Sequence, residues 1–421
     1  MTTRLLALLL VLVVSGCASW PRRWGAAPCC IETKPVVRRQ PIWWHLFDVT
    51  VLEPLEGPFH LIRPAKKWAG VPTRALNLRE GRVADSAFFT DRDPAELSPE
   101  QVRWGPTRPG DEAVAPLVIT KSKTEGKTSG FFATDARGRR YLLKLDPVAA
   151  PELLSGAEVV ASKLLHALGY RVPSYEVLTI PATGLRVALD AVMKAPDGGV
   201  RPLTQADLDG LLDGRLRGGA VRVAASELIA GEILGPARFK QFRDCAEIRA
   251  LRLAYAWLNN IDTKDHNSLL VWDGTRTLGY LIDFGTSLGA DAGLGGPKHP
   301  CAGWNYIVDL REASLELLTL GLRRSRCPLD AQAVSPGVGL ILPHVDPDRW
   351  KPYAPNVAFR EMNDEDARWM SRRMARFSHA QLGAAVSAGR YSDPADAAYL
   401  VDVLARRRDD IVRRYVGGRD Q

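Results

Sequence analysis

The sequence predicts an α+β protein in which most strands precede most helices. Between residues 117 and 193, short apolar runs alternate with polar, glycine-containing turns, a pattern typical of strands. Only one stretch of this part, 151–168, has apolar residues at helical spacing. After residue 220 the apolar residues recur mostly at helical spacing, with one apolar hairpin over 268–282.

The composition is that of an ordinary globular protein. The chain has 421 residues, of which 46% are hydrophobic and 25% are charged. That length is enough for one large domain or two ordinary ones. The formal net charge of +8 is a mild bias, compatible with an anionic ligand or an anionic membrane surface. Because the sequence has no nucleic-acid-binding motif, we expect no nucleic-acid partner.

Residues 1–17 have the features of an export signal. An unbroken apolar run, Leu5–Val14, follows Arg4 and is about half as long as a segment that spans a bilayer. The run ends in Val-Ser-Gly-Cys, which resembles the lipobox of bacterial lipoproteins. In that family the chain is cut before the cysteine, here Cys17, which is then acylated and holds the protein on the membrane. An ordinary signal peptide or a short membrane anchor is the alternative interpretation.

Ala18, rather than an Asp, follows this cysteine, which in lipoproteins resembles outer-membrane sorting. We therefore expect a lipid-anchored protein on the periplasmic side of the bacterial cell envelope, on the outer rather than the inner membrane. An exported protein meets an oxidising compartment, so disulfides are allowed. Cys301 and Cys327 are a candidate pair that flanks a helical segment. Pairing cannot be deduced from the sequence for the other cysteines, which are Cys29, Cys30 and Cys245.

Residues 18–116 form an N-terminal extension rich in Pro, Arg and Trp. We expect part of it to be a tether from the membrane and part to pack on the body of the protein. Trp43 and Trp44 have two interpretations, contact with a lipid interface or packing in the interior. Interior packing is the expected role.

The polar residues that most suggest chemistry flank the apolar hairpin. Asp262 and Asn267 lie in the loop 260–267 that leads into its first strand, and Asp283 follows its second strand. A hairpin holds its two ends side by side because the turn fixes the register, so these side chains should converge. Two carboxylates and an amide suit a hard cation such as Mg²⁺ that keeps substrate phosphates as its remaining ligands.

The order Asp262-x-Lys264-x-x-Asn267, followed by Asp283-Phe-Gly, resembles the catalytic loop and the metal-binding Asp-Phe-Gly of the protein-kinase-like superfamily. Asn-Ile stands where typical kinases have His-Arg, and no Ala-Pro-Glu follows. Atypical branches tolerate both departures, among them the HipA-type kinases and the phosphatidylinositol 3- and 4-kinases. The resemblance implies a bilobal fold, with a small antiparallel β N-lobe that carries one helix and a mainly helical C-lobe.

The resemblance also assigns a role to each polar residue of the loop. Asp262 would orient the acceptor group and accept its proton, and Lys264 would stabilise the transferring phosphoryl group. Asn267 and Asp283 would hold Mg²⁺. The alternatives for single roles are Asp265, which we interpret as a loop or capping residue, and His266, which would orient the loop or the acceptor.

Residues 117–197 are the expected N-lobe. Lys144, on a strand, would hold the nucleotide phosphates. Glu158, in the helical stretch, would pair with Lys144 and orient its ammonium group. Glu152 is the competing partner, but it lies at the helix start, where an acidic residue favours the helix dipole. Two glycines of the preceding loop would lie over the phosphates, although a hairpin turn explains them equally well: Gly126 and Gly130. Two further strands, 174–180 and 185–193, would complete a five-stranded antiparallel sheet, and Lys194–Gly199 would lie near the inter-lobe hinge.

Residues 198–421 are the expected C-lobe with its C-terminal helices. A flexible, glycine-rich loop over 285–303 would follow the hairpin. The last helix has a basic face that we expect to be solvated, with contact to anionic lipid headgroups as the alternative, made by Arg406, Arg407, Arg408, Arg413 and Arg414. The expected helices are 220–233, 246–259, 304–322, 366–377, 378–388 and 394–416.

These observations lead to a membrane-anchored, kinase-like phosphotransferase that uses ATP and Mg²⁺. The acceptor is not indicated, and protein, lipid headgroup, sugar and small molecule all stay open. The bacterial periplasm is not known as an ATP-rich space, which motivates the alternative of a non-catalytic kinase-fold binding or scaffold lipoprotein. The presence of Lys144, Asp262 and Asp283 favours catalysis.

Overall fold

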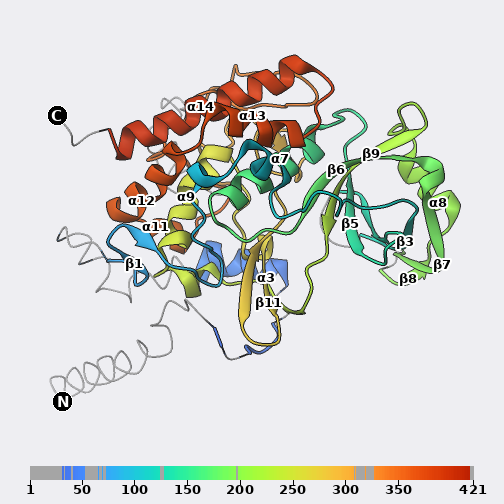
Figure 1. Cartoon of the computed structure of the whole chain (residues 1–421), viewed down its shortest axis with the longest axis horizontal. Helices are drawn as coiled ribbons and strands as arrows, with labels where there is room; N and C mark the ends of the chain where they lie inside the picture. Colours follow the sequence, from blue (N-terminus) through green and yellow to red (C-terminus); the bar gives the residue numbers. More distant parts are fainter. Residues whose placement is uncertain are drawn as a thin grey trace.

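The computed structural model describes residues 31–32, 34–38, 41–52, 65, 69, 73–123, 128–195, 198–307, 309, 318 and 327–417. Within them, a strand-rich lobe lies beside a larger helical lobe that carries the C-terminal helices along one side (Figure 1). The predicted α+β class, with a sheet that precedes a mainly helical C-terminal part, is confirmed. Residues 1–17 with Cys17, the loop residue Gly126, and both Cys29 and Cys30 lie outside the described residues.

The strand-rich lobe contains one sheet of seven strands in the order β6-β9-β5-β4-β3-β7-β8. Neighbouring strands are antiparallel except for β3 and β7, which run parallel. The prediction of five strands, all antiparallel, was therefore wrong in the number of strands and in one pairing. The strands are β3 (Leu117–Ser122), β4 (Gly130–Thr134), β5 (Arg140–Leu145), β6 (Tyr175–Pro181), β7 (Leu185–Lys194), β8 (Val200–Pro202) and β9 (Ala220–Glu227).

The largest error concerns β9, because we expected a helix over 220–233. The chain instead forms β9 in the middle of the sheet and then β10 (Glu232–Gly235). Val223 on one face of β9 and Ala224 on the other are both almost completely buried. A strand that is buried on both faces lacks the polar alternation of a surface strand, so periodicity alone does not separate it from a buried helix.

The junction between the lobes also differs from the prediction. Lys194–Gly199 connects β7 to β8 at the edge of the sheet, so the hinge prediction was wrong. The chain leaves the sheet after β9, passes through residues 228–231 and enters β10, which pairs with β11 (Ser268–Trp272) of the helical lobe. The sheet therefore continues past residue 198, where we expected the C-lobe to begin.

The predicted N-lobe helix is α7 (Leu153–Ala167), and it packs between the sheet and the C-terminal helices (Figure 1). Every residue of α7 except His166 is buried. The carboxylate of Asp146 accepts hydrogen bonds from the free N–H groups of the first turn, at 3.0 Å from Leu154 and 2.8 Å from Ser155. A side chain at Gly156 would meet the ring of Tyr391 at 2.6 Å, so the glycine permits this close packing.

The helical lobe confirms most of the predicted helices and their N-caps. Asn363, Ser378 and Asp393 each accept hydrogen bonds at the start of the helix that follows. Arg407 is buried and donates to the Trp257 carbonyl at 2.8 Å, so it does not belong to a solvated face. The elements of this lobe are α9 (Ala246–Leu258), β11, β12 (Thr277–Leu281), β13 (Ala290–Asp291), β14 (Gly296–Pro297), α11 (Val357–Arg360), α12 (Asp364–Ala375), α13 (His379–Ala388) and α14 (Pro394–Tyr415).

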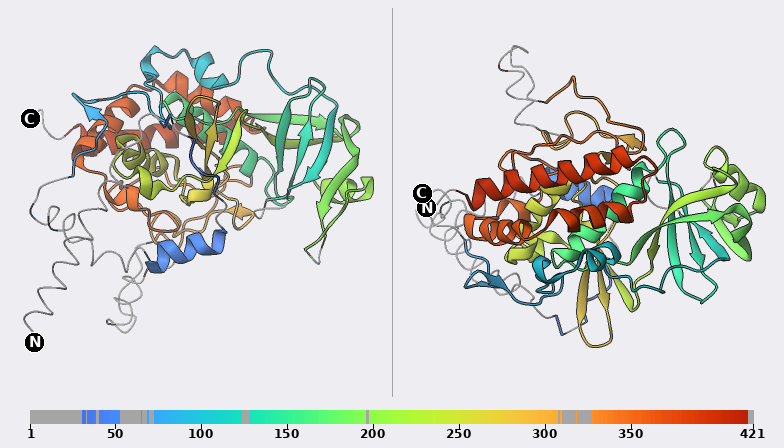
Figure 2. Two further views of the ribbon diagram at one scale, coloured as in Figure 1. Left: turned by 90° about the horizontal axis from the view of Figure 1, so that it is seen from below. Right: turned by 45° about the horizontal axis from the view of Figure 1, so that its top comes forward.

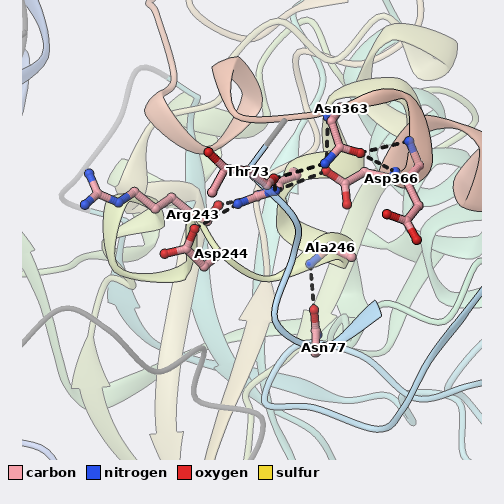
Figure 3. Close-up of polar contacts among 9 residues, drawn as sticks. Thr73, Asn77, Arg243, Asp244, Ala246, Asn363 and Asp366 are labelled. Atoms are coloured by element: carbon pink, nitrogen blue, oxygen red, sulfur yellow. Dashed lines mark hydrogen bonds and ion pairs between the residues drawn. The ribbon is translucent and has the colours of Figure 1, made fainter. Parts of the chain in front are cut away.

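Part of the N-terminal extension is built into this lobe, as Figure 3 shows for the segment that begins at Thr73. The carbonyl of Thr73 accepts hydrogen bonds from Arg249 at 2.7 Å and from Asn363 at 3.0 Å. The side chain of Asn77 accepts from the backbone N–H of Ala246, at the start of α9, at 2.8 Å. The elements from here to the sheet are β1 (Leu78–Arg79), β2 (Arg82–Val83), η3 (Pro94–Glu96) and α6 (Pro99–Trp104).

The cysteines that the structure describes include the pair that the sequence analysis predicted. Cys301 and Cys327 form the predicted disulfide, and Cys245 is a buried free thiol. The predicted helix over 304–322 lies mostly outside the described residues. Among the residues that the structure describes, no helix is both long and apolar enough to cross a membrane.

Candidate functional site

A buried ion pair joins the sheet to α7. Lys144, near the end of β5, places its Nζ atom 2.5 Å from Oε1 of Glu158 and 2.9 Å from Oδ1 of Asp283. The side chains of Lys144 and Glu158 are 7% and 2% exposed. The predicted pairing with Glu158 is confirmed, whereas Glu152 instead accepts a hydrogen bond from the backbone of Ser392 at 2.9 Å.

The electrostatics of this group follow from its burial and its opposite charges. Burial raises the pKa of Glu158, and the attraction of Lys144 opposes that rise. Burial would also raise the pKa of Asp283, but Lys144 outweighs it and lowers the pKa to about 2. The pKa of Lys144 is raised, because Asp283 and Glu158 outweigh the loss of solvent around the ammonium group. Asp283 is therefore ionised at neutral pH beside the ammonium group of Lys144.

Two further lysines stand near the same carboxylate. Lys264 and Lys123 both lower the pKa of Asp283. Lys123, just after β3, donates to the Thr128 carbonyl at 3.1 Å. Burial and the neighbouring Lys144 lower the pKa of Lys123. Sequence reasoning missed Lys123, because a lysine in a polar loop carries no signal until the fold brings its strand beside β4.

Gly130 lies opposite Lys144 in the pairing of β4 with β5. A side chain at Gly130 would come 2.3 Å from the carbonyl oxygen of Leu143, so only a glycine permits this approach of the two strands. This contact accounts for Gly130 without a ligand. Its predicted place over the phosphates, like that of Gly126, stays a prediction.

The loop that follows α9 carries the second group of site residues. Asn259 ends α9 in a left-handed conformation. Lys264 pairs with Asp262 through its ammonium group, and the amide nitrogen of Asn267 donates to the backbone carbonyl of Asp262 at 2.8 Å. Asp265 is nearly buried and accepts from the backbone N–H of Phe239 at 3.1 Å, which confirms its interpretation as a loop residue.

The hairpin brings this loop to Asp283, as its register predicted. Ser268 is paired with Leu281 across β11 and β12, and the backbone N–H of Ile282 donates to the Asn267 carbonyl at 3.0 Å. Asp283 then adopts a left-handed conformation with φ of 61°. Such a conformation is uncommon for a non-glycine residue and is found disproportionately at functional sites.

The phenol of Tyr175, at the start of β6, is a further member of the site. Its oxygen accepts from the backbone N–H of Asp283 at 3.3 Å, and its ring lies 5.7 Å from that of Phe284. Burial raises the pKa of Tyr175, so the phenol is neutral at neutral pH. Sequence reasoning missed this residue too, because nothing in a strand tyrosine indicates which distant loop it will meet.

The segment after Asp283 is held more firmly than the predicted flexible loop. Lys298 is buried and donates to the carbonyls of Thr286 at 2.8 Å and Leu288 at 2.6 Å. The hydroxyl of Thr286 donates to Asn260 at 2.9 Å. The segment is therefore tied together internally by Lys298 and fixed to the catalytic-loop candidate through Thr286.

One observation indicates that the residues predicted to hold Mg²⁺ are compatible with a metal ion. The side-chain oxygen of Asn267 is buried and makes no hydrogen bond. An orphaned buried oxygen is costly unless a ligand completes it, and amide and carboxylate oxygens are ligands that Mg²⁺ accepts. Among the described residues, no cluster of three or more His, Cys, Asp or Glu could hold a metal unaided. A cation at Asn267 and Asp283 would therefore depend on phosphates and waters for its other ligands.

A pocket of about 750 Å³ lies elsewhere on the helical lobe. It is lined by segments 299–304 and 340–350 and by the end of α14. Asn259 touches it, and the side chain of Asn259 accepts from the indole of Trp350 at 3.2 Å. None of the residues assigned to phosphoryl transfer lines this pocket.

Comparison with known proteins finds only distant similarity, to solved structures of kinases. No protein-family model and no curated protein matches the chain. Three similar solved structures are of kinases, at low similarity. The Helicobacter pylori proinflammatory kinase CtkA is 10% identical, with a TM-score of 0.36, over 73% of this chain and 99% of that chain. A Golgi casein kinase is 9% identical, with a TM-score of 0.30, over 94% of this chain and 96% of that one.

A second structure of the Golgi casein kinase, described as having Mn/ADP bound, is 9% identical, with a TM-score of 0.27 over 72% of this chain and 75% of that one. Such scores carry no conclusion about the chemistry of this chain, which has to be inferred from its own residues. The finer resemblance to HipA-type and phosphatidylinositol kinases stays a prediction.

Proposed function

We propose that the chain is a kinase-like phosphotransferase that moves the γ-phosphoryl group of ATP to an acceptor with the help of Mg²⁺. The observation that carries the proposal is the position of Lys144, held by Glu158 from α7 and by Asp283 from the far end of the hairpin. Three elements far apart in the sequence thus meet at the ammonium group of Lys144. Ionisable groups with strongly perturbed pKa values and a specific charge partner occur preferentially at functional sites.

Each residue of the site has a role that its contacts support. Lys144, with Lys123 and Lys264 close by, would neutralise the phosphates. Asn267 and Asp283 would hold Mg²⁺, which supplies a positive charge that neutralises the oxygens of the transferring group. Oδ1 of Asp283 already faces Lys144, which leaves its second oxygen for the metal.

Asp262 is the residue that would orient the acceptor and take its proton. Its carboxylate is 18% exposed and can therefore be reached by a second substrate, while its pairing with Lys264 fixes the direction of the side chain. Phosphoryl transfer requires mainly positioning and charge neutralisation, so this small set of groups is sufficient. Attachment to the bacterial envelope through an acylated Cys17 is part of the same proposal, supported by the sequence of residues 5–17.

The test is the release or transfer of labelled γ-phosphoryl from Mg²⁺–ATP, with water or the chain itself as the acceptor. Replacing Asp262 by Asn keeps the shape of the side chain but removes the base, so the rate should fall by about 10²- to 10⁴-fold. Binding of the nucleotide should be unchanged in that variant. A wild-type rate no higher than that of Asp262→Asn, with nucleotide bound, would favour the binding or scaffold lipoprotein instead.

A further inference from the structure

The described part of the extension includes a short helix, α3 (Ile42–Phe47), that continues into one turn of π-helix, η1 (Asp48–Leu52). Figure 2 shows this blue segment along the outside of the helical lobe. Four large apolar side chains of α3 are solvent-exposed, although we expected the tryptophans to be buried. Their exposed fractions are 51% for Ile42, 64% for Trp43, 41% for Trp44 and 42% for Phe47.

The exposed side chains form one cluster. The ring of Trp44 lies 5.6 Å from that of Trp43 and 5.6 Å from that of Phe47. Soluble surfaces seldom gather several large aromatic rings in one place without something that covers them. Tryptophan in particular favours the membrane–water interface, because its ring is apolar and its N–H can still reach water.

The opposite face of this segment is fixed to the candidate catalytic loop. His45 is buried, with its Nδ1 atom 3.5 Å from Oδ2 of Asp265 and its ring 5.5 Å from that of His266. Asp48 forms an ion pair with Arg238 at 2.9 Å. The exposed aromatic face therefore keeps a fixed place relative to the loop that carries Asp262.

The sequence on the N-terminal side of α3 determines what lies near this face. Only 24 residues separate Cys17 from Ile42, and the apolar run of the export signal ends just before that cysteine. Between them, Lys34 pairs with Glu232 at 2.6 Å and the backbone N–H of Arg38 donates to the Leu234 carbonyl at 2.8 Å, so the described chain just before α3 is already held against β10. Between residues 18 and 72 there are eight Lys or Arg and four Asp or Glu, a balance that suits an anionic lipid surface.

We infer that the face formed by Ile42, Trp43, Trp44 and Phe47 lies in the interfacial region of a lipid bilayer and holds the catalytic loop against the membrane. Because α3 itself touches Asp265 and His266, about one helix diameter, roughly 10 Å, separates the bilayer surface from the loop. This inference uses the proposed N-terminal attachment but not the phosphotransferase activity. It provides a second, positional contact that a flexible tether alone does not supply.

The experiment uses the full chain in anionic vesicles whose acyl chains carry bromine near the headgroups, which quenches tryptophan emission on contact. The chain has 11 tryptophans, so two indoles at the interface supply about a fifth of the total emission, and the bromine should quench up to this fraction. The double variant Trp43→Phe/Trp44→Phe should lose this component. An equal quenched emission in the wild type and the double variant would overturn the inference.

Two controls separate the possible failures. Trp104→Phe removes a partly exposed indole on α6, which is bonded to Glu100, and should leave the quenched emission unchanged. Flotation of the vesicles reports the N-terminal attachment by itself, since it should persist in every variant. Loss of flotation in the wild type would overturn both the attachment and the inference, whereas transfer of labelled phosphoryl would still test the enzyme.

Discussion

The two halves of the candidate site differ in how their charges are satisfied. In the half proposed to bind the nucleotide, Lys144 and Glu158 are almost completely buried, and Lys144 also contacts Asp283, whose side chain is 39% exposed. On the acceptor side, Asp262 and Lys264 are 18% and 26% exposed, and they are neighbours in one loop. The residues of the first half come from β5, from α7 and from the end of the hairpin, so the tertiary fold brings them together. The residues of the second half lie within a few positions of one another in the sequence.

The difference shows which part of the site is complete without a ligand. The buried half joins Lys144 to two carboxylates by contacts within the protein, so its geometry does not depend on a ligand. The loop half contains the orphaned oxygen of Asn267, which is satisfied only when a ligand arrives. Changes on the buried side should therefore affect folding and binding together, and changes on the loop side should affect binding or transfer alone.

The largest expected effect is that of Lys144→Met. It leaves Glu158 buried without its partner and should lower the free energy of unfolding by about 3–5 kcal/mol, as well as abolish nucleotide binding. Denaturant unfolding and nucleotide titration measure the two effects. In the double variant Lys144→Met/Glu158→Leu, apolar groups replace both partners, so stability should recover while binding stays absent. A double variant whose stability stays as low as that of Lys144→Met would show that the pair is not a self-contained unit.

A smaller effect is expected from Asn267→Ala on the loop side. Loss of one oxygen ligand should raise the Mg²⁺ concentration needed for nucleotide binding by about 10-fold, since loss of a partner at a metal site typically costs 10- to 100-fold. Stability should fall by only about 1 kcal/mol, the value of the hydrogen bond to Asp262. Titration of Mg²⁺ at fixed nucleotide is the measurement, with Asn267→Asp as the variant that keeps an oxygen there. An unchanged Mg²⁺ requirement in the alanine variant would remove Asn267 from the metal site.

The smallest effect concerns pH. The pKa of Asp283 is lowered to about 2, below the ordinary 3.8, so its contribution is present above pH 3.8 and is lost as the pH falls towards 2. Titration of Asp283 should therefore cause no loss of Mg²⁺–nucleotide affinity between pH 8 and pH 5. Calorimetric titrations across that range test this, with a nucleotide analogue that keeps one protonation state. A loss of Mg²⁺–nucleotide affinity centred near pH 4 to 5 in the wild type would mean that Lys144 does not hold the Asp283 carboxylate ionised.

The loop half was the easier part of the site to predict from sequence. Asp262, Lys264 and Asn267 lie within six residues, and the hairpin after them fixes where Asp283 must come, so local spacing carries the information. The pairing of Lys144 with Glu158 was also found, because a strand and the helix that follows it are adjacent in the sequence.

What the sequence did not reveal depends on contacts between distant segments. The strand β9 was taken for a helix because burial on both faces removes the alternation that identifies strands. Lys123 and Tyr175 join the site only when β3 and β6 take their places in the sheet. Trp43 was expected to be buried, but which face of a six-residue helix packs inward is decided by the contact of His45 with Asp265, a residue distant in the sequence.

The most direct test of the central claim is a thermal melt of the full chain with and without Mg²⁺–ATP, beside Asp283→Asn. A ligand that binds only the folded state raises the midpoint, and at a concentration of 100 times its dissociation constant it adds about 2.7 kcal/mol. We predict a rise that needs both Mg²⁺ and nucleotide in the wild type and is absent in the variant. No rise at millimolar ATP, or the same rise in Asp283→Asn, would contradict the assignment of this site to nucleotide and metal.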